Sequence, residues 1–219
     1  MTGVQTCALP ILKRELRDLR AQSTANLAGS QRAAELERLL RYEQGPTYPK
    51  DYRPVSTSVI SFPSGPFEQQ IAIAAGSGSG IGLNTPVVSA DGLVGRVTNV
   101  APSTAVVTLI TDPDSAVAAR DLTSSVSGLI RHGPGGTLMF DRVAKEQVVQ
   151  KGDVIVTQGT RDRKYPDLYP YGIPIGRVVS VGRSDIASYL TVQVTPFAAL
   201  GSLDSVAALV ATKGTPKLP

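Results

Sequence analysis

The sequence holds few side chains that could carry out catalysis, and its only histidine is the first to consider. His132 lies in RHGPGG, a segment rich in turn-forming residues. A serine hydrolase needs its histidine beside a nucleophile and a carboxylate. Because the chain contains no G-D-S-G-type nucleophile loop, the residues disfavour a chymotrypsin-like protease.

Residues for metal or cofactor binding are equally scarce. The only cysteine, Cys7, lies in MTGVQTCALPI at 1–11, which is identified as a translated sequencing adapter and is excluded from fold reasoning. One histidine and no authentic cysteine exclude His-rich and Cys-ligated metal sites. The glycine-rich AAGSGSGIG at 74–82 lacks the lysine and the following helix of a phosphate-binding loop. We expect no metal and no cofactor.

The charge distribution limits the classes of partner. The formal net charge is +4, and residues 13–53 carry nine Lys/Arg against six Asp/Glu, so the remainder is nearly neutral. No basic stripe interleaved with aromatic residues is present, which argues against nucleic-acid binding. A basic segment beside a membrane fits better, although a solvated helix face explains the same residues. No stretch approaches the ~18 apolar residues of a membrane span.

A repeated phrase gives the first indication of the elements. GRVTNV at 95–100 is followed by GRVVSV at 176–181. Valine and threonine favour strands, and an interior glycine marks a bend or a close backbone approach. We predict that each copy belongs to its own small β-barrel, with Gly95 equivalent to Gly176 and Val97 equivalent to Val178. A single eight-stranded barrel that uses both copies is the alternative.

From Val55 onward the hydrophobic pattern has a period of two and predicts an all-β body. The stretch Val206 to Val210 is a final strand or a short helical turn. Eleven further strands are expected at 55–61, 69–75, 86–90, 93–100, 104–110, 115–120, 126–131, 136–141, 154–158, 174–182 and 188–195.

The segment before this body predicts one long helix over 12–44, because it lacks proline and is rich in Leu, Ala, Glu and Arg. Gly45-Pro46 ends it, and 45–54 reads as a linker. A helix with a thin apolar stripe needs a partner. A two-stranded coiled coil is favoured, and packing on the chain's own β-domain is the alternative. The expected dimer interface consists of Leu12, Leu16, Leu19, Leu36 and Leu40.

Between about Val55 and Ala211 the chain contains GIGLNTPVV after a Gly-Ser-rich turn, DGLVGRV, LITDPDSAV, KGDVIVTQG, GIPIGRVVSV and VTPFAALGSLDSV, in that order. With these pieces it resembles the rod shape-determining protein MreC family. One departure is RDRKYPDLYPYGIPIG, which is longer than the compact proline-glycine turn expected there.

The resemblance implies a noncatalytic extracytoplasmic scaffold of the cell-elongation machinery. Such a protein would be held by one N-terminal membrane helix, missing from this fragment, and would form a homodimer that could extend into a filament. It would connect the elongation-specific penicillin-binding transpeptidase to MreD and MreB and so organise peptidoglycan synthesis. The alternative function is an envelope-associated β-barrel hydrolase that uses His132.

The resemblance also implies two six-stranded barrels, with the second inserted into the first. The first barrel is expected at 55–112 plus 185–212 and the second at 113–184. Residues 213–219 are expected to form a flexible tail.

The loop RDRKYPDLYPYG concentrates Tyr165, Tyr169 and Tyr171 beside several cations. Tyrosine and arginine often anchor protein interfaces. We predict a partner-binding loop with Tyr169 as its main anchor. The alternative is that the three tyrosines cap the open end of the second barrel.

Overall fold

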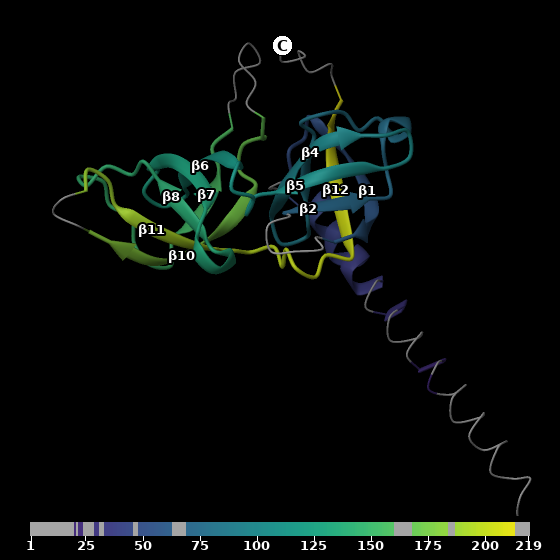
Figure 1. The fold of residues 1–219 in the computed structure, drawn as a ribbon, viewed down its shortest axis with the longest axis horizontal. Coiled ribbons are helices and arrows are strands. Elements are labelled where there is room, and N and C mark those ends of the chain that lie inside the picture. Colours follow the sequence, from purple (N-terminus) through teal and green to yellow (C-terminus); the bar gives the residue numbers. More distant parts are fainter. Residues whose placement is uncertain are drawn as a thin grey trace, which may run out of the picture.

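The computed structural model describes residues 20, 22–23, 29–30, 33–45, 48–62, 69–159, 168–183 and 187–212. Within these ranges a helical segment is followed by twelve strands and two short 3-10 helices, η1 (Ser77–Ser79) and η2 (Pro134–Gly136) (Figure 1). The predicted adapter segment 1–11 and tail 213–219 lie outside the described residues.

The strands close into two six-stranded barrels, so the predicted all-β body of two barrels is confirmed. The alternative of a single eight-stranded barrel is wrong. In spatial order the first barrel contains β1 (Tyr52–Ser61), β12 (Ser205–Ala211), β3 (Pro86–Val88), β4 (Leu93–Val100), β5 (Ala105–Leu109) and β2 (Gln70–Ile73). The second contains β10 (Pro174–Gly182), β11 (Thr191–Pro196), β8 (Leu138–Asp141), β7 (Ser127–His132), β6 (Ala116–Asp121) and β9 (Val154–Thr157).

The second barrel is inserted between β5 and β12, as expected. The register of β1 with β12 runs from Tyr52↔Ala211 to Ser58↔Ser205. Figure 1 shows the yellow β12 among the blue and teal strands of the first barrel, although it is remote from them in sequence.

Two predicted boundaries need correction. The first barrel was expected to resume at residue 185, yet β11 (Thr191–Pro196) pairs with β10 and β8 of the second barrel. The alternating Val192 and Val194 are both fully buried, so β11 supplies core side chains to that barrel. The first barrel also begins earlier than expected, because Tyr52 already pairs with β12 inside the predicted linker.

The repeated GRV phrases occupy equivalent positions. In β4, Gly95 pairs with Leu109 and Val97 with Val107, and a bulge follows before Asn99. In β10, Gly176 and Val178 pair with β11 at matching positions, and a bulge follows before Ser180. The strand registers therefore confirm that Gly95 corresponds to Gly176 and Val97 to Val178.

The same correspondence extends around both barrels and shows an exchange of strands. β1 to β5 correspond in order to β7 to β11, and β12 corresponds to β6. β12 pairs with β3 through Ala207↔Val88 and Ala208↔Val87, and β6 pairs with β9 at the equivalent positions, Arg120↔Val156 and Asp121↔Ile155. Each half of the chain thus supplies six strands, and its last strand closes the barrel of the other half.

The apolar core has two clusters. One fills the first barrel and includes Val206 and Ala208 of β12. The alternate residues of the same strand, Ala207 and Leu209, face the other cluster, which continues into the interior of the second barrel. Residues on the outer face of the first barrel therefore pack in the same apolar cluster as the interior of the second barrel.

The helical segment packs on the first barrel. Residues 33–43 form a continuous helix, and Leu39 is only 1% exposed within the shared cluster. Glu35 Oε1 accepts the Ser205 backbone N–H at 3.3 Å, and Glu43 Oε1 accepts the Ser56 hydroxyl at 2.8 Å. The long coiled-coil helix predicted over 12–44 is not supported beyond this segment in the described residues. No described helix is long and apolar enough to span a membrane.

The repeated glycines allow a close backbone approach that a side chain would prevent. A Cβ at Gly95 would lie 2.0 Å from the Thr108 carbonyl oxygen, and one at Gly176 would lie 2.3 Å from that of Thr195. We expect Gly95→Ala and Gly176→Ala each to lower the free energy of unfolding by about 1–3 kcal/mol or more, because strand backbones must shift. Denaturant titration monitored by circular dichroism measures this change.

The matched control is Gly82→Ala, where the nearest atom would lie 4.0 Å from the added Cβ. It should change the free energy of unfolding by less than about 0.5 kcal/mol. Equal stability of all three variants would contradict the assigned role of the repeated glycines.

Candidate functional site

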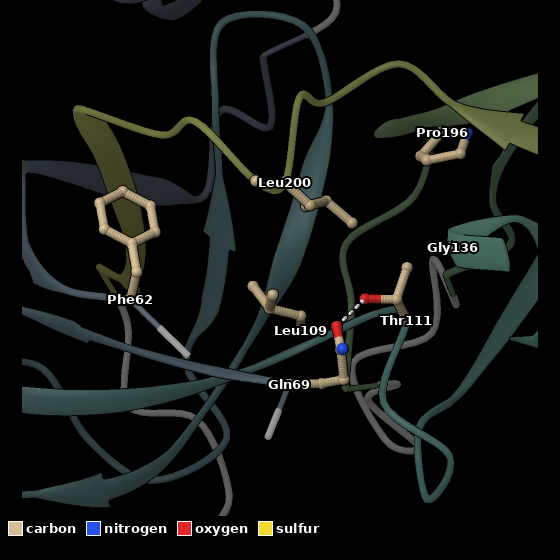
Figure 2. A pocket seen from close by; sticks show the side chains of 8 residues that line it. Phe62, Gln69, Leu109, Thr111, Gly136, Pro196 and Leu200 are labelled. Atoms are coloured by element: carbon tan, nitrogen blue, oxygen red, sulfur yellow. Dashed lines mark hydrogen bonds between the residues drawn. The ribbon is translucent and has the colours of Figure 1, made fainter. Parts of the chain in front are cut away.

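The two barrels meet where the chain crosses twice between them, at 110–115 and again at 197–204. A cavity of about 420 Å³ lies at this junction. Figure 2 shows Leu200 of the return crossing near Leu109, with Gln69 and Thr111 beside them. None of the lining side chains carries a charge, so the cavity offers no acid, base or cation for chemistry. They belong to Phe62, Gln69, Leu109, Thr111, Gly136, Pro196, Leu200 and Gly201.

A chain of hydrogen bonds links the two barrels beside this cavity. The Thr111 hydroxyl donates to Gln69 Oε1 at 2.8 Å, next to β2 of the first barrel (Figure 2). The Thr111 carbonyl oxygen lies 2.7 Å from Nδ1 of His132, the last residue of β7 in the second barrel. Thr111 itself is buried at 5% exposure. The outgoing crossing is therefore bonded to both barrels.

This geometry gives His132 a structural role. In a hydrolase triad a carboxylate binds Nδ1 and stabilises the imidazolium that forms. Here a neutral backbone carbonyl occupies that position. The described part of the chain also contains no group of three or more His, Cys, Asp or Glu that could hold a metal ion.

The predicted tyrosine loop is placed only in part. Tyr165 lies outside the described residues, and Tyr171 is half-buried and makes contacts. Tyr169 is 5% exposed within the shared core cluster. Burial raises the pKa of Tyr169 to about 12, partly opposed by Arg96 of the first barrel. The burial favours an internal packing role for Tyr169, while partner binding by this loop stays a prediction.

Sequence reasoning missed a second tyrosine group, which lies at the end of the predicted helix and in the predicted linker. Tyr42, Tyr48 and Tyr52 pack against the shared cluster, and the Tyr42 and Tyr48 rings form an edge-to-face pair at 5.9 Å. Burial raises the pKa of Tyr42 to about 12 and also raises the pKa of Tyr48. Three tyrosines within eleven residues, at 42, 48 and 52, were the available signal. This segment packs against the body of the protein.

The helix presents two apolar faces. Leu39 is buried against the barrel, whereas Leu36 and Leu40 are 40% and 51% exposed. Residues four apart lie on one side of a helix, so Leu36 and Leu40 form a continuous exposed stripe. The other predicted dimer residues, Leu12, Leu16 and Leu19, lie outside the described residues. The dimer interface stays a prediction.

The family model described as "Rod shape-determining protein MreC, barrel core" matches residues 59–210. This chain belongs to the MreC family. The match runs from the end of β1 to the end of β12, and it includes the whole second barrel, the crossings between the barrels and the repeated GRV phrases.

The MreC relatives agree in sequence and in fold. The Escherichia coli cell shape-determining protein MreC is 33% identical over 166 residues, which are 75% of this chain and 44% of that protein. With 56% of the Haemophilus influenzae MreC covered, the chain spans about half the length of these curated relatives. The Pseudomonas aeruginosa MreC crystal structure is 26% identical, with a TM-score of 0.66 over 72% of this chain and 99% of that one.

A further MreC structure was solved as a complex. It contains MreC and penicillin-binding protein PBP2 from Helicobacter pylori. Its matching chain is 16% identical, with a TM-score of 0.57 over 73% of this chain and 98% of that one. At this identity the similarity shows a shared fold.

The buried Tyr169 predicts a loss of stability at alkaline pH. Its folded pKa of about 12 exceeds the ordinary value of 10.0, so the folded state holds its proton more tightly. The contribution is fully present below pH 10 and is lost as the pH rises toward 12. Tyr169→Phe keeps the ring and removes the titration. From pH 10 to pH 11 the parent should lose about 1 kcal/mol more of its free energy of unfolding than this variant.

Urea titrations at the two pH values measure the difference. Tyr189→Phe, at a side chain that is 50% exposed, is the control and should follow the parent. If the parent and Tyr169→Phe lose the same free energy, the hydroxyl of Tyr169 is not buried in solution.

Proposed function

We propose that this chain is the extracytoplasmic part of a noncatalytic scaffold that organises peptidoglycan synthesis and rod shape by binding other proteins. The observation that carries the proposal is the MreC barrel-core match over 59–210, with relatives named as cell shape-determining proteins. The uncharged cavity at the junction and the backbone-bound His132 support binding in place of catalysis.

The principal partner is the elongation-specific penicillin-binding transpeptidase. The complex of PBP2 with MreC from Helicobacter pylori supports this assignment, because the same fold binds a penicillin-binding protein there. MreD and MreB complete the proposed assembly. A membrane helix preceding this fragment would hold the barrels on the extracytoplasmic side.

The exposed helix stripe supports a homodimer. Leu39 and Glu35 fix the helix on the first barrel, so Leu36 and Leu40 point away from that contact. A second copy could cover these leucines and extend the seam through Leu12, Leu16 and Leu19. Membrane tethering would favour the pairing, because it raises the effective concentration of the helices. Extension of the dimers into filaments would need a further contact.

The proposed function is tested by measuring binding of the full-length natural protein to its cognate elongation transpeptidase. In biolayer interferometry with both proteins in detergent, we expect saturable binding. His132→Asn keeps a donor near the position of Nδ1 and should bind equally and restore rod shape to a deletion strain. A folded His132→Asn protein that binds normally but fails to restore rod shape would instead support a catalytic histidine.

The dimer is tested with paired charges on the exposed stripe. In membrane-tethered protein, Leu36→Asp with Leu40→Asp should reduce cysteine crosslinking through the helix at least tenfold, because two carboxylates per helix would face each other across the seam. The control, Ala34→Asp, adds a charge at another exposed position of the same helix and should crosslink normally. Undiminished crosslinking of the double variant would locate the dimer contact on the barrels.

A further inference from the structure

The turn between β3 and β4 is held rigidly. The Ser89 backbone N–H donates to the Gly92 carbonyl oxygen at 2.8 Å. The hydroxyl oxygen of the buried Ser89 accepts the backbone N–H groups of Asp91 and Gly92, each at 3.3 Å. These bonds fix the position of Gly92 relative to the first barrel. This turn contains the start of the DGLVGRV motif. The first glycine of the motif is Gly92, and the atoms nearest to a Cβ added there all lie outside the first barrel.

Gly92 touches the second barrel. A Cβ at this position would lie 2.5 Å from the Pro174 carbonyl oxygen and 3.6 Å from Cβ of Phe197. Pro174 is the first residue of β10, and Phe197 follows β11 directly. The approach is therefore one of backbone to backbone, and a carbonyl held at the start of a barrel strand cannot move aside as a long side chain would.

The surrounding residues make this contact part of the core. Val88 and Leu93, on either side of the turn, belong to the cluster that includes Phe140 and Ile175 of the second barrel, and Ala90 packs against it. Interfaces between domains permit motion by default unless they are large and hydrophobic. Here the hairpin of one barrel shares its apolar cluster with the interior of the other.

The contact joins equivalent corners of the two barrels. Leu93 lies two residues before Gly95, and Pro174 lies two residues before Gly176. Each is paired across a bulge with the preceding strand, Leu93 with Val88 and Pro174 with Val156. The two family motifs DGLVGRV and GIPIGRV therefore meet each other at the junction, with Gly92 against Pro174.

We infer that Gly92 is a positioning residue that fixes the angle between the two barrels, so that a partner binds both barrels as one rigid surface. The hydrogen bonds of Thr111 to Gln69 and His132 hold the outgoing crossing in place. The consequence for partner binding rests on the proposed scaffold function. The geometry of the junction does not.

The glycines of this chain provide matched comparisons. The close contacts of Gly95 and Gly176 are to the Thr108 and Thr195 carbonyls within their own barrels, whereas that of Gly92 lies between barrels. Gly201, in the return crossing, has nothing within 4 Å of an added Cβ. Gly92→Ala should therefore alter the angle between barrels, and Gly201→Ala should leave it unchanged.

Double electron–electron resonance measures the distance between two spin labels, and with one label on each barrel this distance depends on the angle between the barrels. Labels are placed at the exposed Asn99 of the first barrel and the exposed Gln147 of the second, in a Cys7→Ser background of the full chain. We expect one narrow distance distribution for the parent and for Gly201→Ala. Gly92→Ala should shift the distribution or broaden it at least twofold, while amide exchange within β4–β5 and β10–β11 stays protected. A parent-like distribution for a folded Gly92→Ala protein would overturn the inference.

If Gly92→Ala fails to fold, the distance distribution of the parent protein still tests the inference. Two populations or a broad distribution in the parent would show barrels that move independently and would also overturn it.

Transpeptidase binding is measured in parallel. If Gly92→Ala alters the distances and weakens binding at least tenfold, both parts of the inference hold. Altered distances with parental binding refute the rigid partner surface, whereas no binding by the parent refutes the proposed function and leaves the distance result to decide the angle.

Discussion

The pairing of β1 with β12 is the interaction on which the rest of the structure depends. It joins Tyr52 to Ala211 and continues in register to Ser58 and Ser205, so the first barrel closes only when the two ends of the body meet. Everything between β5 and β12 is thereby enclosed as an insertion. The entropic cost of closing so long a loop grows slowly with its length, but such non-local pairing slows folding. The six strands of the second barrel, β6 to β11, are consecutive in sequence, so we expect this barrel to fold before β1 and β12 pair.

Close backbone approaches explain Gly92 and Gly95 of the DGLVGRV segment and Gly176 of the GIPIGRV segment. Gly95 and Gly176, which suggested bends, admit neighbouring carbonyls within a barrel, and Gly92 admits one between barrels. The sole histidine bonds a backbone carbonyl at the crossing. In this structure these residues make packing and backbone contacts, which is compatible with the proposed scaffold function.

The strands were predictable because their two-residue period and turn glycines are local signals. β4 and β10 were predicted at their observed bounds, and the doubtful segment 206–210 is the strand β12. Partners of strands are non-local, so the pattern of β11 fitted either barrel and was assigned to the wrong one. Tyr48 and Tyr52 were hidden in a proline-containing stretch, where only tertiary packing reveals burial. Tyr169 was predicted to be an exposed anchor for the same reason, because a tyrosine side chain is equally suited to an interface and to a core, and only the fold shows that this one is buried.

The central structural claim is that both barrels form one cooperative body through exchanged strands and a shared apolar cluster. Native-state hydrogen exchange at increasing denaturant tests it most directly, because it reports the opening free energy of individual amides. As the denaturant concentration rises, the opening free energies of the slowest amides in β1 and β12 should converge with those in β10 and β11 on a single unfolding isotherm. Two separate isotherms, with the second barrel still protected after β1 and β12 have exchanged, would contradict the claim.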